Sequence, residues 1–108
     1  MSKTVLITGA SGGIGGACVR LFAASGYKVA VHYNSDEAAA NKLTDELRSN
    51  GCEAVCVCAD LRDEAQVNRM FAEVEAQLGE VEVLVNNAGV SQQKLFTDTT
   101  LADYDFVF

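Results

Sequence analysis

The sequence predicts an α/β fold with a doubly wound parallel sheet, and three observations support this. Short β-rich segments alternate with amphipathic helical segments along the 108 residues. A glycine-rich loop follows the first strand directly. No proline, repeat or low-complexity tract interrupts the chain. We therefore expect a single domain over residues 1–108, built from about four strands with intervening helices.

Four short segments rich in β-branched residues are the expected strands. They lie at residues 4–7, 28–33, 53–59 and 81–86. Near the end of the chain, Thr100 and Asp103 have the spacing of a helix start. We expect this last helix to continue to Phe108, so that the strand at 81–86 has no partner on its outer side.

Apolar residues at helical spacing predict one helix after each of the first three strands. The first helix begins near Ile14 and ends at Gly26. The second helix has Asn34 as its N-cap, with Glu37 completing a capping box, and it ends at Gly51. The third helix ends at Gly79. The expected buried positions are Ile14, Ala17, Cys18, Leu21 and Phe22 in the first helix, Ala39, Leu43 and Leu47 in the second, and Val67, Met70, Phe71, Val74 and Leu78 in the third.

Composition narrows the possible partners. A net charge of −7 argues against a broad surface for nucleic acid or anionic membrane, since both are polyanions. It leaves room for one bound nucleotide, because backbone N–H groups can hold phosphates without positive side chains. No apolar run is long enough to span a bilayer, and the first strand begins at Thr4, which leaves no room for a signal peptide. We expect a cytoplasmic protein.

Four cysteines raise the question of a disulfide or a metal site. They are Cys18, Cys52, Cys56 and Cys58. Cys56 and Cys58 are too close in sequence for the usual zinc spacing, and the single histidine, His32, lies on another strand. We expect reduced cysteines that act as small core residues, and no metal site.

The run from Thr8 to Gly15 reads TGASGGIG and lies between the first strand and the first helix. Such a loop brings the unpaired N–H groups of a helix start to the carboxyl edge of the sheet. A pyrophosphate can approach there only where no Cβ intervenes, which explains the need for glycine. A tight turn is the alternative, but it needs fewer glycines than this run contains.

Two motifs together resemble the short-chain dehydrogenase/reductase family. Thr8, Gly9, Gly13 and Gly15 match the family's nucleotide loop, and the run from Asn86 to Gly89 (NNAG) matches its second motif. The resemblance implies a Rossmann-type sheet of which this chain is only the N-terminal portion, a truncated NAD(P)-binding domain. By itself the NNAG run could also be an ordinary turn, although Asn86 is also able to hydrogen-bond across the sheet and fix the strand ends.

The resemblance implies a set of cofactor-binding residues along these motifs. Asp60 would accept a hydrogen bond from the adenine amino group, with the amide of Leu61 nearby, although a helix cap or a surface loop is the alternative for Asp60. Around the phosphates and the ribose, the implied residues are Thr8, Gly9, Ser11, Gly12, Gly13, Ile14, Gly15, Asn87, Ala88 and Gly89.

The end of the second strand bears on the choice between NADP and NAD. An acid there would bind the ribose hydroxyls and repel a 2′-phosphate, but the chain has Asn34 and Ser35 instead. Both can donate hydrogen bonds to a phosphate, which favours NADP. Against this, no arginine or lysine is present at the strand end, Gly12 stands where NADP-preferring relatives often carry a basic residue, and Asp36 follows. NAD therefore stays possible.

The catalytic residues of the family have no counterpart in the chain. The family uses a Tyr whose pKa is lowered by a Lys four positions later, together with a Ser and an Asn. Tyr27, Tyr33 and Tyr104 are followed at that distance by Val31, Glu37 and Phe108. We therefore expect no catalytic residues in these 108 residues, and a chain that is inactive alone. An unpaired edge on the fourth strand further predicts marginal stability or poor solubility.

Within the family the chain is most similar to bacterial 3-oxoacyl-acyl-carrier-protein reductases. Residues 91–98 also resemble relatives that reduce the 5-aminopentanone modification of elongation factor P. The implied function is NADP(H)-dependent reduction of a small or carrier-bound carbonyl by a longer parent protein, which the resemblance predicts to be a homo-oligomer. The alternative is a nucleotide-binding module without catalysis, either regulatory or the remnant of a decayed gene.

Overall fold

The computed structural model describes residues 3–10, 13–87 and 105–107. Its strands are β1 (Thr4–Thr8), β2 (Lys28–Tyr33), β3 (Ala54–Cys58), β4 (Val81–Asn86) and β5 (Asp105–Val107). Its helices are α1 (Gly13–Ala24), α2 (Glu37–Ser49) and α3 (Glu64–Leu78). Each predicted strand and each of the three helices between them is present.

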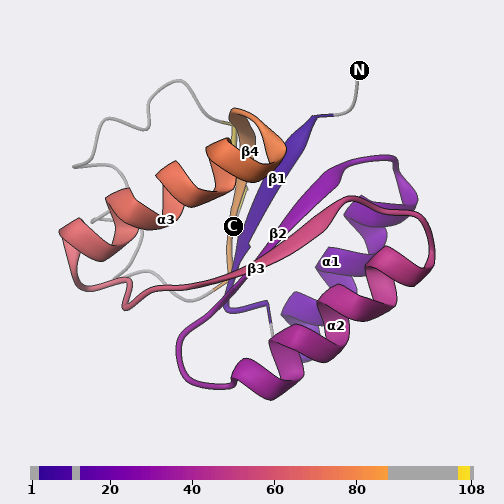
Figure 1. Cartoon of the computed structure of the whole chain (residues 1–108), viewed down its shortest axis with the longest axis horizontal. Coiled ribbons are helices and arrows are strands. Elements are labelled where there is room, and N and C mark those ends of the chain that lie inside the picture. The colour runs from indigo at the N-terminus through magenta and orange to yellow at the C-terminus, as the bar shows by residue number, and fades with distance from the viewer. Residues whose placement is uncertain (1–2, 11–12, 88–104, 108) are drawn as a thin grey trace.

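The strands form one parallel sheet in the order β3-β2-β1-β4-β5. Helices α1 and α2 cover one face and α3 covers the other (Figure 1). The chain winds from β1 outward to β3, and then α3 carries it back to β4 on the other side of β1. This reversal creates a switch point between β1 and β4, where the strand ends of a Rossmann-type sheet form a crevice. The doubly wound fold class is confirmed.

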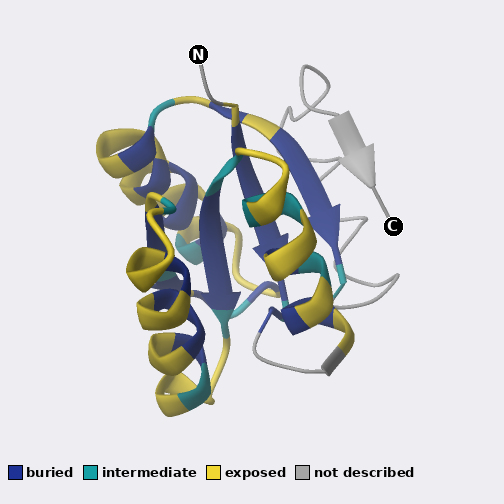
Figure 2. Ribbon diagram, turned by 90° about the vertical axis from the view of Figure 1, so that its right-hand side faces the viewer, coloured by how far each residue is buried: buried dark blue, intermediate teal, exposed yellow. Residues whose placement is uncertain are grey.

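The core lies on both faces of the sheet, and the central strands are buried on both sides (Figure 2). Under α3 the sheet contributes residues such as Leu6, Ala30 and Leu84. The α3 prediction is confirmed at every position, since the buried residues of this helix are Val67, Met70, Phe71, Val74 and Leu78. Gly79 ends the helix at φ 103°.

The predicted buried face of α1 is wrong by part of a turn. Ile14 is 76% exposed and Leu21 67% exposed, and Ala17 is exposed as well. The core face instead centres on Val19, which is fully buried, with Cys18 and Phe22 packed beside it. The physical reason is a close contact between the start of α1 and the loop after β1, which turns Gly15 rather than Ile14 toward the sheet.

The start of α2 also differs from the prediction. Asp36, not Asn34, is the N-cap, and its side chain accepts a hydrogen bond from the backbone N–H of Ala39 at 3.2 Å. β2 stays paired with β3 as far as Tyr33, so the chain needs a short loop before the helix can begin. Asp caps as well as Asn does. The buried residues of α2 are Ala40, Leu43, Thr44 and Leu47, while Ala39 is half-buried.

The end of the chain is a strand and not the predicted helix. β5 pairs in parallel with residues 83–85 of β4, so the prediction of an unpaired β4 edge is also wrong. The reason is that aromatic and β-branched residues in the segment Asp105–Val107 suit a strand, and the edge of β4 offers free backbone groups to pair with. Poor solubility of the chain stays a prediction.

The four cysteines are free thiols. Cys18, Cys52 and Cys56 are half-buried and pack against the core, as predicted. Cys58 is exposed, which corrects its expected place in the core. It is the last residue of β3, the edge strand of the sheet, and its thiol lies at the surface.

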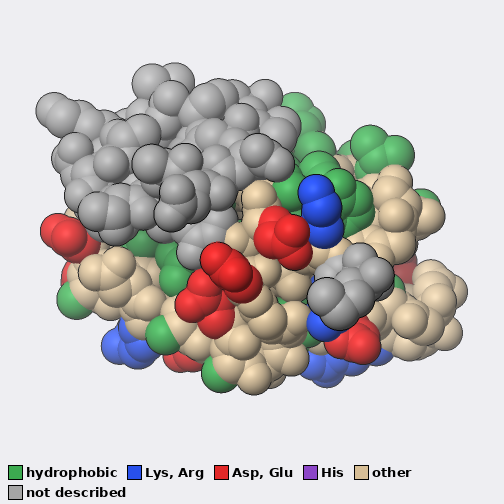
Figure 3. Space-filling view, turned by 90° about the horizontal axis from the view of Figure 1, so that it is seen from above, with side chains coloured by type: hydrophobic (Ala, Val, Ile, Leu, Met, Phe, Trp, Pro, Cys, Tyr) green, Lys and Arg blue, Asp and Glu red, His purple; other side chains and the backbone are tan. Residues whose placement is uncertain are grey.

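The surface mixes charges of both signs. Acidic and basic side chains are interspersed on the face in Figure 3 among the described residues. None of the helices in the described part of the chain has the length and apolar character needed to cross a membrane.

Candidate functional site

The glycine loop lies at the carboxyl edge of the sheet, where the sequence predicts it. β1 ends at Thr8, and Gly9 turns the chain with φ 62°, a conformation that favours glycine. α1 begins at Gly13, so its N-terminal N–H groups face the switch point. Ser11 and Gly12 lie outside the described residues.

Gly15 is where the loop and the helix approach most closely. A Cβ on Gly15 would lie 2.5 Å from the carbonyl oxygen of Gly9, 2.7 Å from Cα of Ala10 and 2.9 Å from Nδ2 of Asn87. Two of these atoms belong to the backbone, so making room for a side chain would require the main chain to shift. At Gly16, one residue on, the nearest atom to an added Cβ is 3.6 Å away. Only glycine at position 15 lets α1 start this close to the strand ends.

Thr8 and Asn87 join the two motifs directly. The buried Thr8 hydroxyl accepts a hydrogen bond from the backbone N–H of Asn87 at 3.0 Å. The same hydroxyl can donate to the Oδ1 atom of Asn86 at 3.2 Å, or to the carbonyl of Val85 at 3.3 Å. Asn87 in turn donates from Nδ2 to the carbonyl of Gly9 at 3.2 Å. The predicted cross-sheet role of Asn86 is thus present; Ala88 and Gly89 lie outside the described residues.

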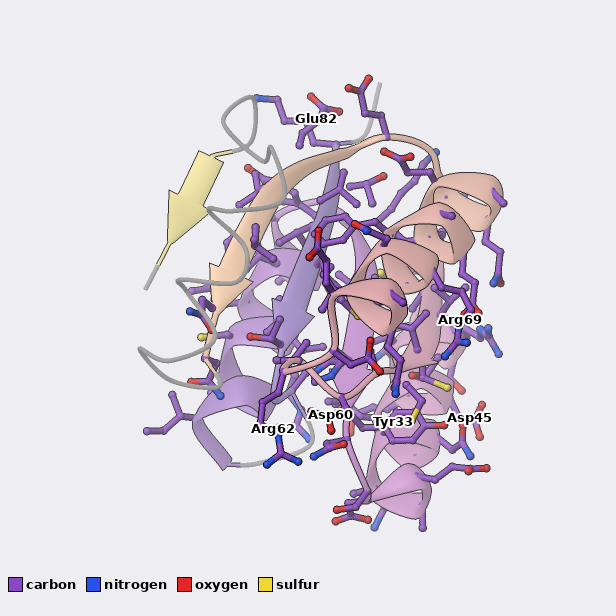
Figure 4. The ribbon with its side chains drawn as sticks, turned by 90° about the vertical axis from the view of Figure 1, so that its left-hand side faces the viewer. Tyr33, Asp45, Asp60, Arg62, Arg69 and Glu82 are labelled. Carbon is purple, nitrogen blue, oxygen red and sulfur yellow. The ribbon has the colours of Figure 1, made fainter. Side chains whose placement is uncertain are left out.

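The segment after β3 brings Asp60 to the same edge of the sheet. Arg62 occupies both carboxylate oxygens of Asp60, from Nε at 3.1 Å and from a terminal nitrogen at 3.1 Å (Figure 4). These hydrogen bonds lower the pKa of Asp60. The cap of α3 is Asp63, so Asp60 is not a helix cap. The Leu61 side chain is buried under α3 and anchors this segment.

The end of β2 leaves Asn34 and Ser35 exposed at the same edge. The carbonyl of Asn34 accepts a weak hydrogen bond from the Cys58 thiol at 3.6 Å, which ties this loop to β3. Tyr33 precedes it, and desolvation, followed by the charge of Glu37, raises the pKa of the Tyr33 phenol. A phenol with a raised pKa is the opposite of the acid that carbonyl reduction needs.

His32 is a residue of this site that sequence reasoning missed. It is buried, and both ring nitrogens contact backbone atoms of the two loops just described. The available signal was a polar residue in an otherwise apolar central strand, next to the predicted cofactor edge. A single histidine without metal-ligand spacing gave no reason to pair it with the loops.

The residues present fit a dinucleotide. Gly15 lets the start of α1 pack against the strand ends, where helix N–H groups can meet a phosphate, and the side chain of Ile14 is exposed there. Asp60, Asn34 and Ser35 lie along the same edge, on the β2 and β3 side. In the described part of the chain, no three His, Cys, Asp or Glu side chains gather as metal ligands do.

Comparison with known proteins agrees with this geometry. Residues 3–108 match the family described as short chain dehydrogenase. The 3-oxoacyl-(acyl-carrier-protein) reductase FabG of Staphylococcus aureus is 36% identical over 107 residues, which cover 99% of this chain and 44% of that protein. A probable tetrahydroxynaphthalene reductase of Zymoseptoria tritici is 36% identical over 98% of this chain and 40% of its own length. The chain thus spans less than half the length of these relatives.

Two solved structures share the fold. A blue fluorescent protein from a metagenomic library, in complex with NADPH, superimposes with a TM-score of 0.77 and 43% identity over 82% of this chain and 36% of its own. A putative dehydrogenase from Burkholderia cenocepacia with bound NADP gives a TM-score of 0.74 and 35% identity over 79% of this chain and 33% of its own. With the family match over nearly every residue, the conclusion is that this chain belongs to the short-chain dehydrogenase/reductase family.

Proposed function

We propose that the chain is the cofactor-binding part of an NADP(H)-dependent oxidoreductase that reduces a carbonyl to an alcohol. The observation that carries this proposal is the close contact at Gly15. There, the start of α1 meets the carbonyl of Gly9 and the amide of Asn87 with no space for a side chain. A tight turn alone would not need this contact, whereas the close packing of the first helix against the strand ends in a dinucleotide-binding βαβ unit does.

The preference for NADP rests on the end of β2. Asn34 and Ser35 are exposed there and carry no negative charge, so a 2′-phosphate would meet hydrogen-bond donors instead of a carboxylate. The solved relatives that hold NADPH and NADP support the same choice. NAD is the second candidate, because Asp36 follows the donors closely.

The substrate class follows from the relatives. Similarity to the 3-oxoacyl-(acyl-carrier-protein) reductase supports a 3-oxoacyl group carried on a protein thioester. The alternative substrate that we propose is an aminopentanone group on elongation factor P, which is supported only by the resemblance of residues 91–98, outside the described part of the chain. On this proposal residues 1–108 are one incomplete domain, the catalytic Ser, Tyr and Lys follow in a longer cytoplasmic protein, and that protein is a homo-oligomer.

Cofactor binding tests the proposal directly. Titration of the full chain with NADPH and with NADH, followed by calorimetry, should give heat with NADPH and a weaker response with NADH. The variant Asn34→Asp should weaken NADPH binding by about tenfold or more, because a carboxylate repels the 2′-phosphate. Asn68→Asp, which adds the same charge on the exposed surface of α3, is the matched control and should bind as the wild type does.

A non-catalytic module is the alternative function, and turnover distinguishes the two. A longer protein that carries this chain should consume NADPH when a 3-oxoacyl thioester is added. Binding of NADPH without any such consumption would favour the module. No heat with either dinucleotide, from a sample whose circular dichroism shows it to be folded, would contradict both.

A further inference from the structure

His32 lies in β2 with its side chain fully enclosed at the carboxyl end of the sheet. Its exposed fraction is 1%. The Nδ1 atom accepts a hydrogen bond from the backbone N–H of Gly9 at 2.9 Å, and Nε2 lies 2.9 Å from the carbonyl oxygen of Ala59. A carbonyl oxygen can only accept, so Nε2 carries the ring proton. The two contacts together specify the neutral ring in one tautomer.

The two partners of the ring belong to different loops of the candidate site. Gly9 opens the glycine loop, whose described part (Gly9, Ala10 and the start of α1 at Gly13 to Gly15) is here called the phosphate loop. Ala59 opens the adenine loop (Ala59 to Leu61). Backbone hydrogen bonds link the same segments. The N–H of Ala10 donates to the carbonyl of His32 at 3.0 Å. The N–H of Ala59 donates to the carbonyl of Tyr33 at 3.3 Å. Four hydrogen bonds thus link both loops to two consecutive residues of β2.

We propose that His32 is a positioning residue for the dinucleotide, and that its neutral imidazole sets the spacing between the phosphate loop and the adenine loop. The inference rests on the proposed function and adds a residue to it. A dinucleotide must be held at its pyrophosphate and at its adenine at the same time. A rigid ring between the two loops fixes the distance between them before the cofactor binds. Less conformational entropy is then lost on binding.

Protonation of the ring would undo this arrangement. With a proton on Nδ1, two N–H groups would face each other at the Gly9 contact, and the phosphate loop would have to move. Burial opposes this by lowering the pKa of His32, while the Ala59 carbonyl offsets part of the effect. The charged groups on the neighbouring segments are Asp60 and Arg62, which pair with each other, and the exposed Asp63 and Glu64 at the start of α3.

Two substitutions separate the two contacts of the ring. His32→Asn places an amide near the position of Nδ1 and can keep the Gly9 contact. His32→Gln reaches further and can keep the Ala59 contact. Neither amide titrates. His32→Leu removes both contacts at similar volume, and its circular dichroism and thermal midpoint show whether the fold survives.

The experiment measures dissociation constants of NADP and NAD for the full chain between about pH 5 and pH 8. The wild type should lose affinity for both on acidification, by up to about tenfold per pH unit below the pKa of the ring. His32→Asn and His32→Gln should lack this loss.

NADP carries a phosphate that titrates near pH 6, and NAD lacks it, so a loss of affinity confined to NADP would come from the ligand and not from His32. At pH 8, His32→Leu should bind both dinucleotides about tenfold or more weakly than the wild type.

Two results would overturn the inference while leaving the proposed function intact. One is a wild type that binds NADP yet shows the same pH profile as His32→Asn and His32→Gln. The other is a nitrogen NMR spectrum of the wild type in which the ring proton sits on Nδ1. A wild type that binds neither dinucleotide at pH 8 would instead overturn the proposed function, and the inference with it.

Discussion

The Thr8 hydroxyl accepts a hydrogen bond from the backbone N–H of Asn87 at 3.0 Å, across 79 residues of sequence. This contact joins the end of β1 to the end of β4, the two strands on either side of the switch point. It adds a side-chain link to the backbone pairing of these two strands, at the edge where a dinucleotide would lie. Both residues belong to motifs that are recognisable in the sequence, but only the fold brings them into contact.

Replacing Thr8 by Val should loosen this junction. The isosteric change leaves the N–H of Asn87 without its acceptor, and we expect a loss of about 1–3 kcal/mol in the free energy of unfolding. Dinucleotide affinity should fall with it. Thr8→Ser keeps the hydroxyl and is the matched control. Urea denaturation measures the effect, and equal stability of Thr8→Val and the wild type would show that the contact carries little energy.

Replacement by alanine at the adjacent glycines Gly15 and Gly16 of α1 should change the free energy of unfolding in opposite directions. At Gly15 the new Cβ would overlap backbone atoms, so we expect a destabilisation of about 1–3 kcal/mol and weak cofactor binding. At Gly16 the space is sufficient, and alanine should stabilise the helix by about 0.5–1 kcal/mol. Thermal denaturation of both variants tests this pair. A tolerant Gly15→Ala would contradict the close approach on which the candidate site depends.

The corrected face of α1 can be tested by truncating one side chain on each side. Val19 is fully buried, and Val19→Ala should cost about 2 kcal/mol through the two lost methyl groups and the cavity they leave. Leu21 is 67% exposed, so Leu21→Ala should change the stability by less than about 0.5 kcal/mol. Chemical denaturation distinguishes the two faces, and the reverse order of effects would restore the face predicted from the sequence.

Acid should destabilise the wild type in a way that depends on His32. Burial holds the pKa of this ring in the folded chain below its ordinary value of 6.5, so the unfolded chain binds the proton more tightly. The resulting stability is fully present above about pH 6.5 and decreases as the pH falls toward the folded-state pKa. The slope can reach about 1.4 kcal/mol per pH unit. His32→Asn should have a flatter profile between about pH 5 and pH 7; parallel profiles would rule out a neutral, buried ring.

Much of the fold follows from local patterns in the sequence. The bounds of β2 and β4 and all five buried positions of α3 match the prediction, because β-branched runs and helical spacing are strong local signals there. The place of the glycine loop at the carboxyl edge also followed from element order alone, since strands of a parallel sheet all end at one edge.

The predictions that the structure corrects have a common cause. In each, a local sequence signal competes with a contact made elsewhere in the chain. In α1, apolar spacing pointed to Ile14 and Leu21, but the packing of Gly15 against Gly9 rotated the helix. At the chain end, a capping pattern predicted a helix, yet the free edge of β4 offered backbone partners for a strand. Asp36 replaced Asn34 as cap because β2 had to stay paired through Tyr33.

The sequence by itself determined the alternation of strands and helices, the glycine loop and the Asn motif, because each depends on residues close together in the chain. Only the tertiary structure decided which face of α1 is buried and that His32 bridges two loops. The bridge through His32 depends on distances to residues that are 23 and 27 positions away in sequence. No local pattern encodes such a distance, because it is set by the order and spacing of the paired strands.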